Sequence, residues 1–272
     1  MRINDLRPTR YTDDRRGGTG FAVGGLGLIG AVVIALLLGV DPSQILNDAG
    51  QAPQTAEPGQ PRADDAAYDF ARRIVGSAED VWTPILKAKG VAFQPATLTV
   101  YDNATPTSCG TGVSAAGPFY CPDDSHIYLD LSFFNALGER FGAPGRFAQA
   151  YVVAHEFGHH VQELTGTMQA HPLGTRGETS DSVRIELQAD CYAGVWANRA
   201  NAQFKILESG DVDDGLRAAA AVGDDTLEKQ TQGTVVPDSF THGTSAERVR
   251  WFKRGLDSGD MDRCDTFGTE RL

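Results

Sequence analysis

The sequence predicts an α+β fold, namely a helix-rich domain with a small sheet, preceded by one transmembrane helix. Apolar residues recur at helical spacing in the runs 148–164 and 185–194. Two short runs rich in β-branched and aromatic residues, 97–101 and 127–130, have the length and composition of strands. The run 21–40 contains 20 residues and no charge, which separates it from the rest of the chain.

This uncharged run is long enough to cross a membrane, because at about 1.5 Å per residue it covers a hydrocarbon core of about 30 Å. Residues 1–20 contain five Arg against three Asp, so the positive-inside rule predicts a cytoplasmic tail. We expect an uncleaved anchor at 21–40, a flexible linker at 41–66 and a single domain at 67–272 outside the cytoplasm. The expected location is therefore the cell membrane, with one crossing.

The elements of the domain follow in order along the chain. Helices are predicted around Tyr68–Val75 and, after a cap at Ser77, at Val81–Lys89. Strands are predicted at Thr97–Tyr101 and around Ile127–Asp130, with a cysteine-containing loop between them. The helices predicted in the runs 148–164 and 185–194 come next, and two or three further helices complete the chain.

Cysteine usage agrees with a location outside the cytoplasm. The four cysteines are even in number and lack zinc-finger spacing. Cys109 and Cys121 are separated by a short loop, which favours a disulfide between them and leaves Cys191 to pair with Cys264. The other two pairings and four free thiols remain open alternatives.

The formal net charge of −12 argues against nucleic acid or anionic lipid headgroups as partners. The chain also has no G-x-S-x-G elbow and no P-loop motif, so neither a serine hydrolase nor an NTP-driven machine is indicated.

The most informative motif is H-E-x-x-H, formed by His155, Glu156 and His159. On a helix, residues four apart are turned by about 40° and separated by about 6 Å, so both imidazoles can bind one metal ion. Glu156 lies beside them, where it can take a proton from water. His160 is turned by about 100° from His159, so we expect it to support the site or belong to the core.

A catalytic zinc site needs three protein ligands, and Glu186 is the best candidate for the third. Asp190 lies one turn further along the same predicted helix, where it can accept the free ring N–H of His155. The alternative is that both carboxylates belong to a solvated acidic face. We also expect the small Ala189, Ala193 and Gly194 to let the two helices approach closely.

The sequences of these motifs resemble those of a known family. H-E-x-x-H followed by E-x-x-x-D is similar to the gluzincin metallopeptidases. H-E-F-G-H-H at 155–160 and E-L-Q-A-D-C-Y-A-G-V-W-A at 186–197 resemble the bacterial putative neutral zinc metallopeptidases. The resemblance runs from about residue 67 to the C-terminus. It implies a zincin-like fold, one zinc per chain, peptide or protein substrates, and a substrate-side strand within Gly117–Leu129.

The segment F-T-H-G-T-S at 240–245, followed by Arg248, extends the resemblance. By analogy with gluzincins, His242 would stabilise the oxyanion of the tetrahedral intermediate. The alternative is a loop histidine that only supports the start of a helix, since Thr244 and Glu247 form a capping-box pattern. Arg248 is expected to form an ion pair or to bind a substrate carboxylate.

The function that follows is a membrane-anchored zinc metallopeptidase, a hydrolase in which zinc activates water and Glu156 is the general base. Two alternatives stand beside it. One is a catalytically inactive zincin-fold protein with a binding or scaffold role, and the other is a zinc amidase that acts on cell-wall peptide.

Overall fold

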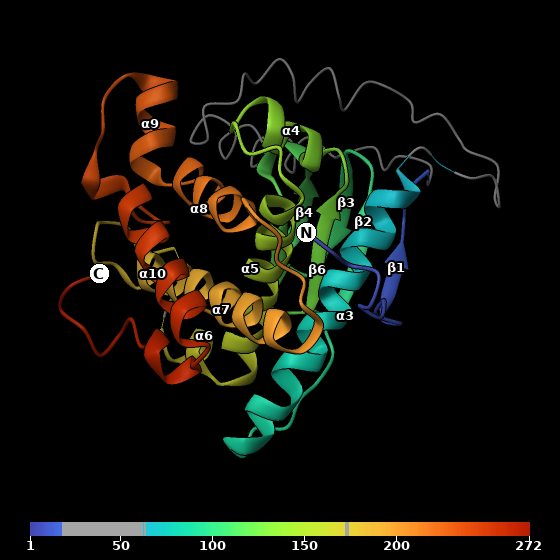
Figure 1. Ribbon diagram of the computed structural model, residues 1–272. Helices are drawn as coiled ribbons and strands as arrows, with labels where there is room; N and C mark the ends of the chain where they lie inside the picture. Colours follow the sequence, from blue (N-terminus) through green and yellow to red (C-terminus); the bar gives the residue numbers. More distant parts are fainter. Residues whose placement is uncertain (18–61, 63, 172–173) are drawn as a thin grey trace.

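The computed structural model describes residues 1–17, 62, 64–171 and 174–272. These residues form the helix-rich α+β structure that the sequence predicts (Figure 1). Helix α5 (Arg146–Leu164) lies at the centre, between the sheet and the C-terminal helices. The other two helices that matter most for the site are α7 (Asp181–Phe204) and α10 (Ser245–Ser258).

The remaining described elements surround these three helices. The helices are α3 (Asp65–Ala88), α4 (Phe133–Glu139), α6 (Thr167–Ala170), α8 (Asp211–Ala221) and α9 (Asp224–Gln232), with 3-10 turns η1 (Ser114–Ala116), η2 (Pro237–Ser239) and η3 (Met261–Cys264). The strands are β1 (Thr12–Asp14), β2 (Thr97–Tyr101), β3 (Ala104–Thr107), β4 (Gly110–Val113), β5 (Phe119–Cys121) and β6 (His126–Asp130).

The main sheet has the strand order β1-β2-β6-β5, and β3 pairs with β4 in a separate hairpin. Strand β2 is parallel to both β1 and β6, whereas β5 runs antiparallel to β6. The predicted strand region Gly117–Leu129 is thus a hairpin rather than one strand. Its first strand, β5, forms the edge of the sheet that contacts α5.

Helix α3 is one continuous helix, so the prediction of two helices separated at Ser77 is wrong. Ser77 lies fully buried inside α3, where its hydroxyl donates to the Ile74 carbonyl and accepts from the Trp196 indole N–H. The helix also contains Pro84, although proline removes a backbone donor. Buried apolar residues on both sides, including Trp82 and Leu86, hold this part of the helix against the core.

Close helix packing depends on small residues, but not on all of those expected. A Cβ on Gly158 would lie 3.0 Å from the Ala189 carbonyl oxygen, so α5 and α7 do meet closely at Ala189. Gly194 faces α10 instead, because a Cβ there would lie 2.1 Å from the Phe252 carbonyl oxygen. Gly255 of α10 is packed reciprocally against the Cys191 carbonyl. The expectation that Gly194 serves the α5–α7 contact is therefore wrong.

Two disulfides join the predicted pairs. Cys109, in the turn of the β3–β4 hairpin, is bonded to Cys121 at the end of β5. Cys191 of α7 is bonded to Cys264 of η3. The second bridge fixes the C-terminal segment to the helix that carries Glu186 and Asp190.

The first 17 residues are part of this fold. Strand β1 extends the main sheet by pairing with β2, with Thr12 opposite Leu98. Leu6 is 1% exposed and belongs to the main core. The α-amino group of Met1 forms ion pairs with Glu208 and Asp211. Residues 1–17 of the predicted tail 1–20 therefore pack against the domain, and residues 18–20 lie outside the described residues.

Gly17 and Arg62, which lie on either side of the segment 18–61, contact the same carboxylate. The backbone N–H of Gly17 donates to Asp102 over 2.8 Å, and the guanidinium of Arg62 contacts the same side chain at 3.0 Å. A single membrane crossing between these residues would place them on opposite sides of the membrane. Among the described residues, no helix is long and apolar enough to span a membrane. The predicted anchor at 21–40 and nearly all of the linker at 41–66 lie outside the described residues.

Candidate metal centre

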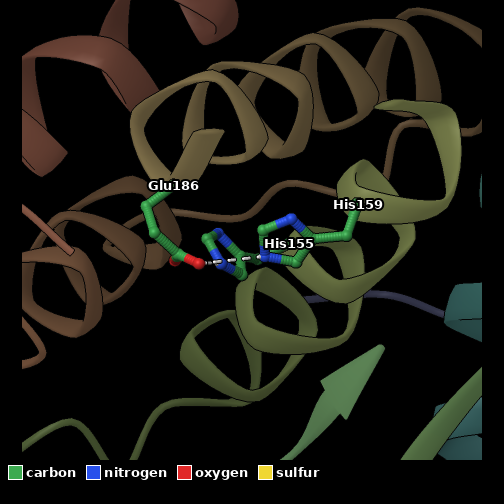
Figure 2. Close-up of side chains that lie close together, drawn as sticks. All are labelled: His155, His159 and Glu186. Atoms are coloured by element: carbon green, nitrogen blue, oxygen red, sulfur yellow. Dashed lines mark hydrogen bonds and ion pairs between the residues drawn. The ribbon is translucent and has the colours of Figure 1, made fainter. Parts of the chain in front are cut away.

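Helices α5 and α7 bring together the three predicted ligands, His155, His159 and Glu186 (Figure 2). The Nε2 atom of His155 lies 3.1 Å from one carboxylate oxygen of Glu186, and Nε2 of His159 lies 3.4 Å from the other. Zinc bonds of about 2.0–2.2 Å in a tetrahedron place ligand atoms about 3.3–3.6 Å apart, and the two separations are within a few tenths of an ångström of this range, so the donor set can hold one zinc ion. Among the described residues this is the one such cluster of His, Cys, Asp or Glu.

Asp190 contacts His155. Its carboxylate oxygen Oδ1 lies 2.9 Å from Nδ1 of His155, so Nδ1 carries a proton, and in the neutral ring Nε2 is the nitrogen that can bind a metal ion. Burial lowers the pKa of His155, but the nearby carboxylates of Asp190 and Glu186 outweigh this effect and raise it to about 10. The site therefore favours positive charge.

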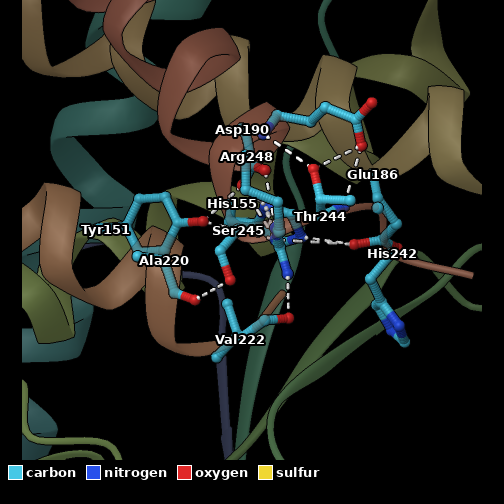
Figure 3. Close-up of polar contacts among 12 residues, drawn as sticks. Tyr151, His155, Glu186, Asp190, Ala220, Val222, His242, Thr244, Ser245 and Arg248 are labelled. Carbon is cyan, nitrogen blue, oxygen red and sulfur yellow. Dashed lines mark hydrogen bonds and ion pairs between the residues drawn. The ribbon is translucent and has the colours of Figure 1, made fainter. Parts of the chain in front are cut away.

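Arg248 completes this network from α10 (Figure 3). Its guanidinium donates to both carboxylate oxygens of Asp190, over 2.8 and 2.9 Å, and to the Val222 carbonyl over 3.2 Å. Tyr151 donates to Oδ1 of Asp190 over 2.5 Å. Asp190 and Arg248 are both buried, so Arg248 is an ion-pair residue of the site.

Gln162 orients the second histidine and is absent from the sequence predictions. Its Oε1 atom accepts from Nδ1 of His159 over 2.8 Å, which leaves Nε2 of His159 for the metal. The amide nitrogen of Gln162 donates to the Ile185 carbonyl and to Gln188, which fixes which end of the amide faces His159. A buried glutamine three residues after the second histidine is the pattern that could have indicated this role.

Glu156 lines a cavity of about 580 Å³ together with all three candidate ligands. Burial raises the pKa of its carboxyl above the ordinary value, which makes the ionised form a stronger base. The same cavity is lined by His242 and by strand β5 residues Phe119 and Tyr120. The predicted catalytic residues and the predicted substrate-side strand therefore share one cavity.

His242 reaches the cavity from the loop before α10. The predicted capping box of Thr244 and Glu247 is present and starts that helix. Asp224, which the sequence predictions missed, holds the loop: one oxygen accepts the backbone N–H groups of Thr241, His242 and Gly243, and the other lies 3.1 Å from Nδ1 of His242. Nδ1 is therefore occupied, and Nε2 is the ring atom left for other partners.

The remaining histidines have structural contacts. His160 is fully buried between the Tyr120 hydroxyl and the Gln94 carbonyl, so it belongs to the core beside the site. His126 contacts Thr99, and His171 contacts Asp181.

Comparison with known proteins gives a consistent picture. The family model described as "Putative neutral zinc metallopeptidase" matches residues 1–267, so the family pattern begins at the first residue and not near residue 67. The chain is 44% identical to the uncharacterized protein YpfJ of Escherichia coli (strain K12), over 98% of this chain and 99% of that protein. It is 40% identical to the uncharacterized protein Rv2575 of Mycobacterium tuberculosis (strain H37Rv), over 88% of this chain and 86% of that protein. No solved structure matches the chain. The match over nearly the whole chain, with the identity to these relatives, shows that the chain belongs to the putative neutral zinc metallopeptidase family.

Proposed function

We propose that the protein is a zinc-dependent peptidase that hydrolyses peptide bonds with Glu156 as general base. The observation that carries this proposal is the donor set of His155, His159 and Glu186 beside Glu156 in one cavity. When bound, zinc would supply a Lewis acid that acidifies a water molecule and polarises the scissile carbonyl. A purely structural site has no use for an adjacent carboxylate base.

The chain's own residues account for the proton transfers. Glu156 accepts a proton from the attacking water and passes it to the departing amine, for which burial and a raised pKa suit it. His242 donates through Nε2 to the carbonyl oxygen as negative charge develops there. Asp224 supports this role because it binds Nδ1 and thereby orients the ring.

The test compares the full-length wild type with Glu156→Gln, both purified without chelator. Zinc content is measured by elemental analysis, and cleavage is measured on an unbiased peptide library. We expect about one zinc per chain in both proteins and cleavage by the wild type alone. Zinc without cleavage by the wild type would refute the peptidase assignment and favour a binding role or a non-peptide amide substrate. Absence of zinc would refute the metal site itself.

We propose that the domain works outside the cytoplasm at the membrane surface, with the first 17 residues on the same side as the domain. Two disulfides support an oxidising compartment. The contacts of Gly17 and Arg62 with Asp102 support the common side.

Cysteine labelling tests this location. Tyr11 is 43% exposed, and Asp257 on α10 is also exposed, so Tyr11→Cys and Asp257→Cys offer matched positions in the N-terminal segment and in the domain. Both should react with a membrane-impermeant maleimide in intact spheroplasts. Labelling of Asp257→Cys alone would contradict a common side, and labelling of neither would contradict the external location.

A further inference from the structure

The cavity that is lined by the candidate metal ligands and by Glu156 is also lined by residues of helix α4 and its surroundings. This part of the cavity is called here the α4 pocket. The residues that line it are small or apolar, except for one arginine. Its residues are Gly117, Phe133, Ala136, Arg140, Phe141 and Val152. All but Arg140 are uncharged.

The α4 pocket is directly next to Glu156. Val152 lies one helical turn before Glu156 on α5, so the two side chains are neighbours on one face of that helix. Both line the cavity, as do the apolar residues of the α4 pocket. A peptide positioned for attack beside Glu156 would therefore place a neighbouring side chain against Val152.

The wall of the pocket is aromatic and only partly covered. The rings of Phe133 and Phe141 lie 6.3 Å apart, and both residues are half-buried. Gly117, at φ +83°, lets the chain pass close to Phe133: a Cβ at this glycine would lie 3.5 Å from the ring. Ala136 leaves space between these groups. Partly exposed rings in a concave site provide apolar surface that a ligand can bury.

The positive charge of Arg140 at the α4 pocket repels basic side chains. Arg140 is exposed at the mouth, and its guanidinium carbon lies 5.6 Å from the centre of the Phe141 ring. The carboxylates among the described residues that line the cavity are Glu156 and Glu186, which belong to the metal site. A lysine or arginine in the α4 pocket would therefore meet the like charge of Arg140, and none of the six residues that form this pocket carries a carboxylate.

We propose that the α4 pocket selects a bulky apolar side chain next to the scissile bond and rejects lysine and arginine. This inference rests on the proposed peptidase function. Phe133 and Phe141 supply the apolar contacts, Ala136 supplies the room, and Arg140 supplies the rejection of basic residues.

The experiment measures kcat/KM on peptides that differ at one position beside the scissile bond, with Phe, Leu, Ala or Lys there. The full-length wild type should prefer Phe and Leu to Lys by more than about tenfold. Phe133→Ala should reduce the preference for Phe over Ala by at least about tenfold. Phe267→Ala removes the same side chain from a site that stacks on His171, outside the cavity, and should leave the preference unchanged.

Arg140→Glu gives a second, gain-of-function readout. The reversed charge should raise kcat/KM for the Lys peptide relative to the Leu peptide, with zinc content unchanged. An unchanged Phe/Ala ratio in Phe133→Ala, or an unchanged Lys/Leu ratio in Arg140→Glu, would overturn the assignment of this pocket. Wild-type protein that cleaves none of the library would instead refute the proposed function, which separates the two failures.

Discussion

Leu6 offers a sharp test of whether the N-terminal segment belongs to the fold. Its side chain is 1% exposed within the main core, although the sequence assigns it to a cytoplasmic tail. Buried Leu→Ala substitutions cost about 2.7–5 kcal/mol, through lost transfer free energy and the cavity left behind. Because Leu6 lies near a chain end that can relax, we expect Leu6→Ala to lower the free energy of unfolding by about 3 kcal/mol, near the bottom of that range.

The assay is equilibrium unfolding of the full chain in guanidinium chloride, followed by fluorescence of the three tryptophans, all of which are fully buried. Tyr11→Ala is the matched control in the same segment. Its side chain is exposed, so its effect should stay within about 0.5 kcal/mol. Equal, small effects of Leu6→Ala and Tyr11→Ala would refute the packing of residues 1–17 on the domain.

Three further predictions concern the metal centre. Glu186→Gln should lose most of the bound zinc while the domain stays folded, by elemental analysis and circular dichroism; stoichiometric zinc would remove Glu186 from the ligand set. Gln162→Leu should weaken zinc affinity by about 10–100-fold in a chelator competition, and unchanged affinity would show that His159 needs no orienting partner. Burial lowers the pKa of His242, but Asp224 and the charge of Glu186 outweigh this and raise it. If protonated His242 stabilises the oxyanion, activity is lost as pH rises through the pKa of His242. Asp224→Asn removes one cause of the raised pKa, so it should move the alkaline limb of the kcat/KM profile to lower pH. An alkaline limb that does not move would contradict the role of His242.

Features that depend on neighbours in the sequence were predictable. The spacing of His155 and His159 follows from helix geometry, and the Thr244 capping box is a local pattern that the structure contains. Strand β2 was predicted with its observed bounds, because its short length and its content of β-branched and aromatic residues are also local features.

Several distant contacts that no recognisable motif marks were missed. Gln162 and Asp224 act through hydrogen bonds to atoms that only the folded chain brings near. The N-terminal arginines are a second example, because the positive-inside rule assigned their charge to a cytoplasmic tail. In the structure, Arg7 pairs with Glu79 and Asp80 of α3. Charge composition alone does not distinguish an arginine that faces cytoplasm from one that binds a carboxylate far along the chain.

Asp190 shows how the fold sets the charge of the metal centre. A buried carboxylate that only oriented His155 would carry a large desolvation cost, and its negative charge would oppose the developing oxyanion. Arg248 offsets that charge through two hydrogen bonds and, with His155, holds the pKa of Asp190 below its ordinary value despite burial. The pair is neutral overall, so Glu186 is the one ligand that contributes negative charge to the ion. With two neutral histidines, a bound divalent zinc would keep a net positive charge, which is the sign needed to stabilise an oxyanion. Helix α10 therefore contributes to the electrostatics of the site although none of its residues is a candidate metal ligand.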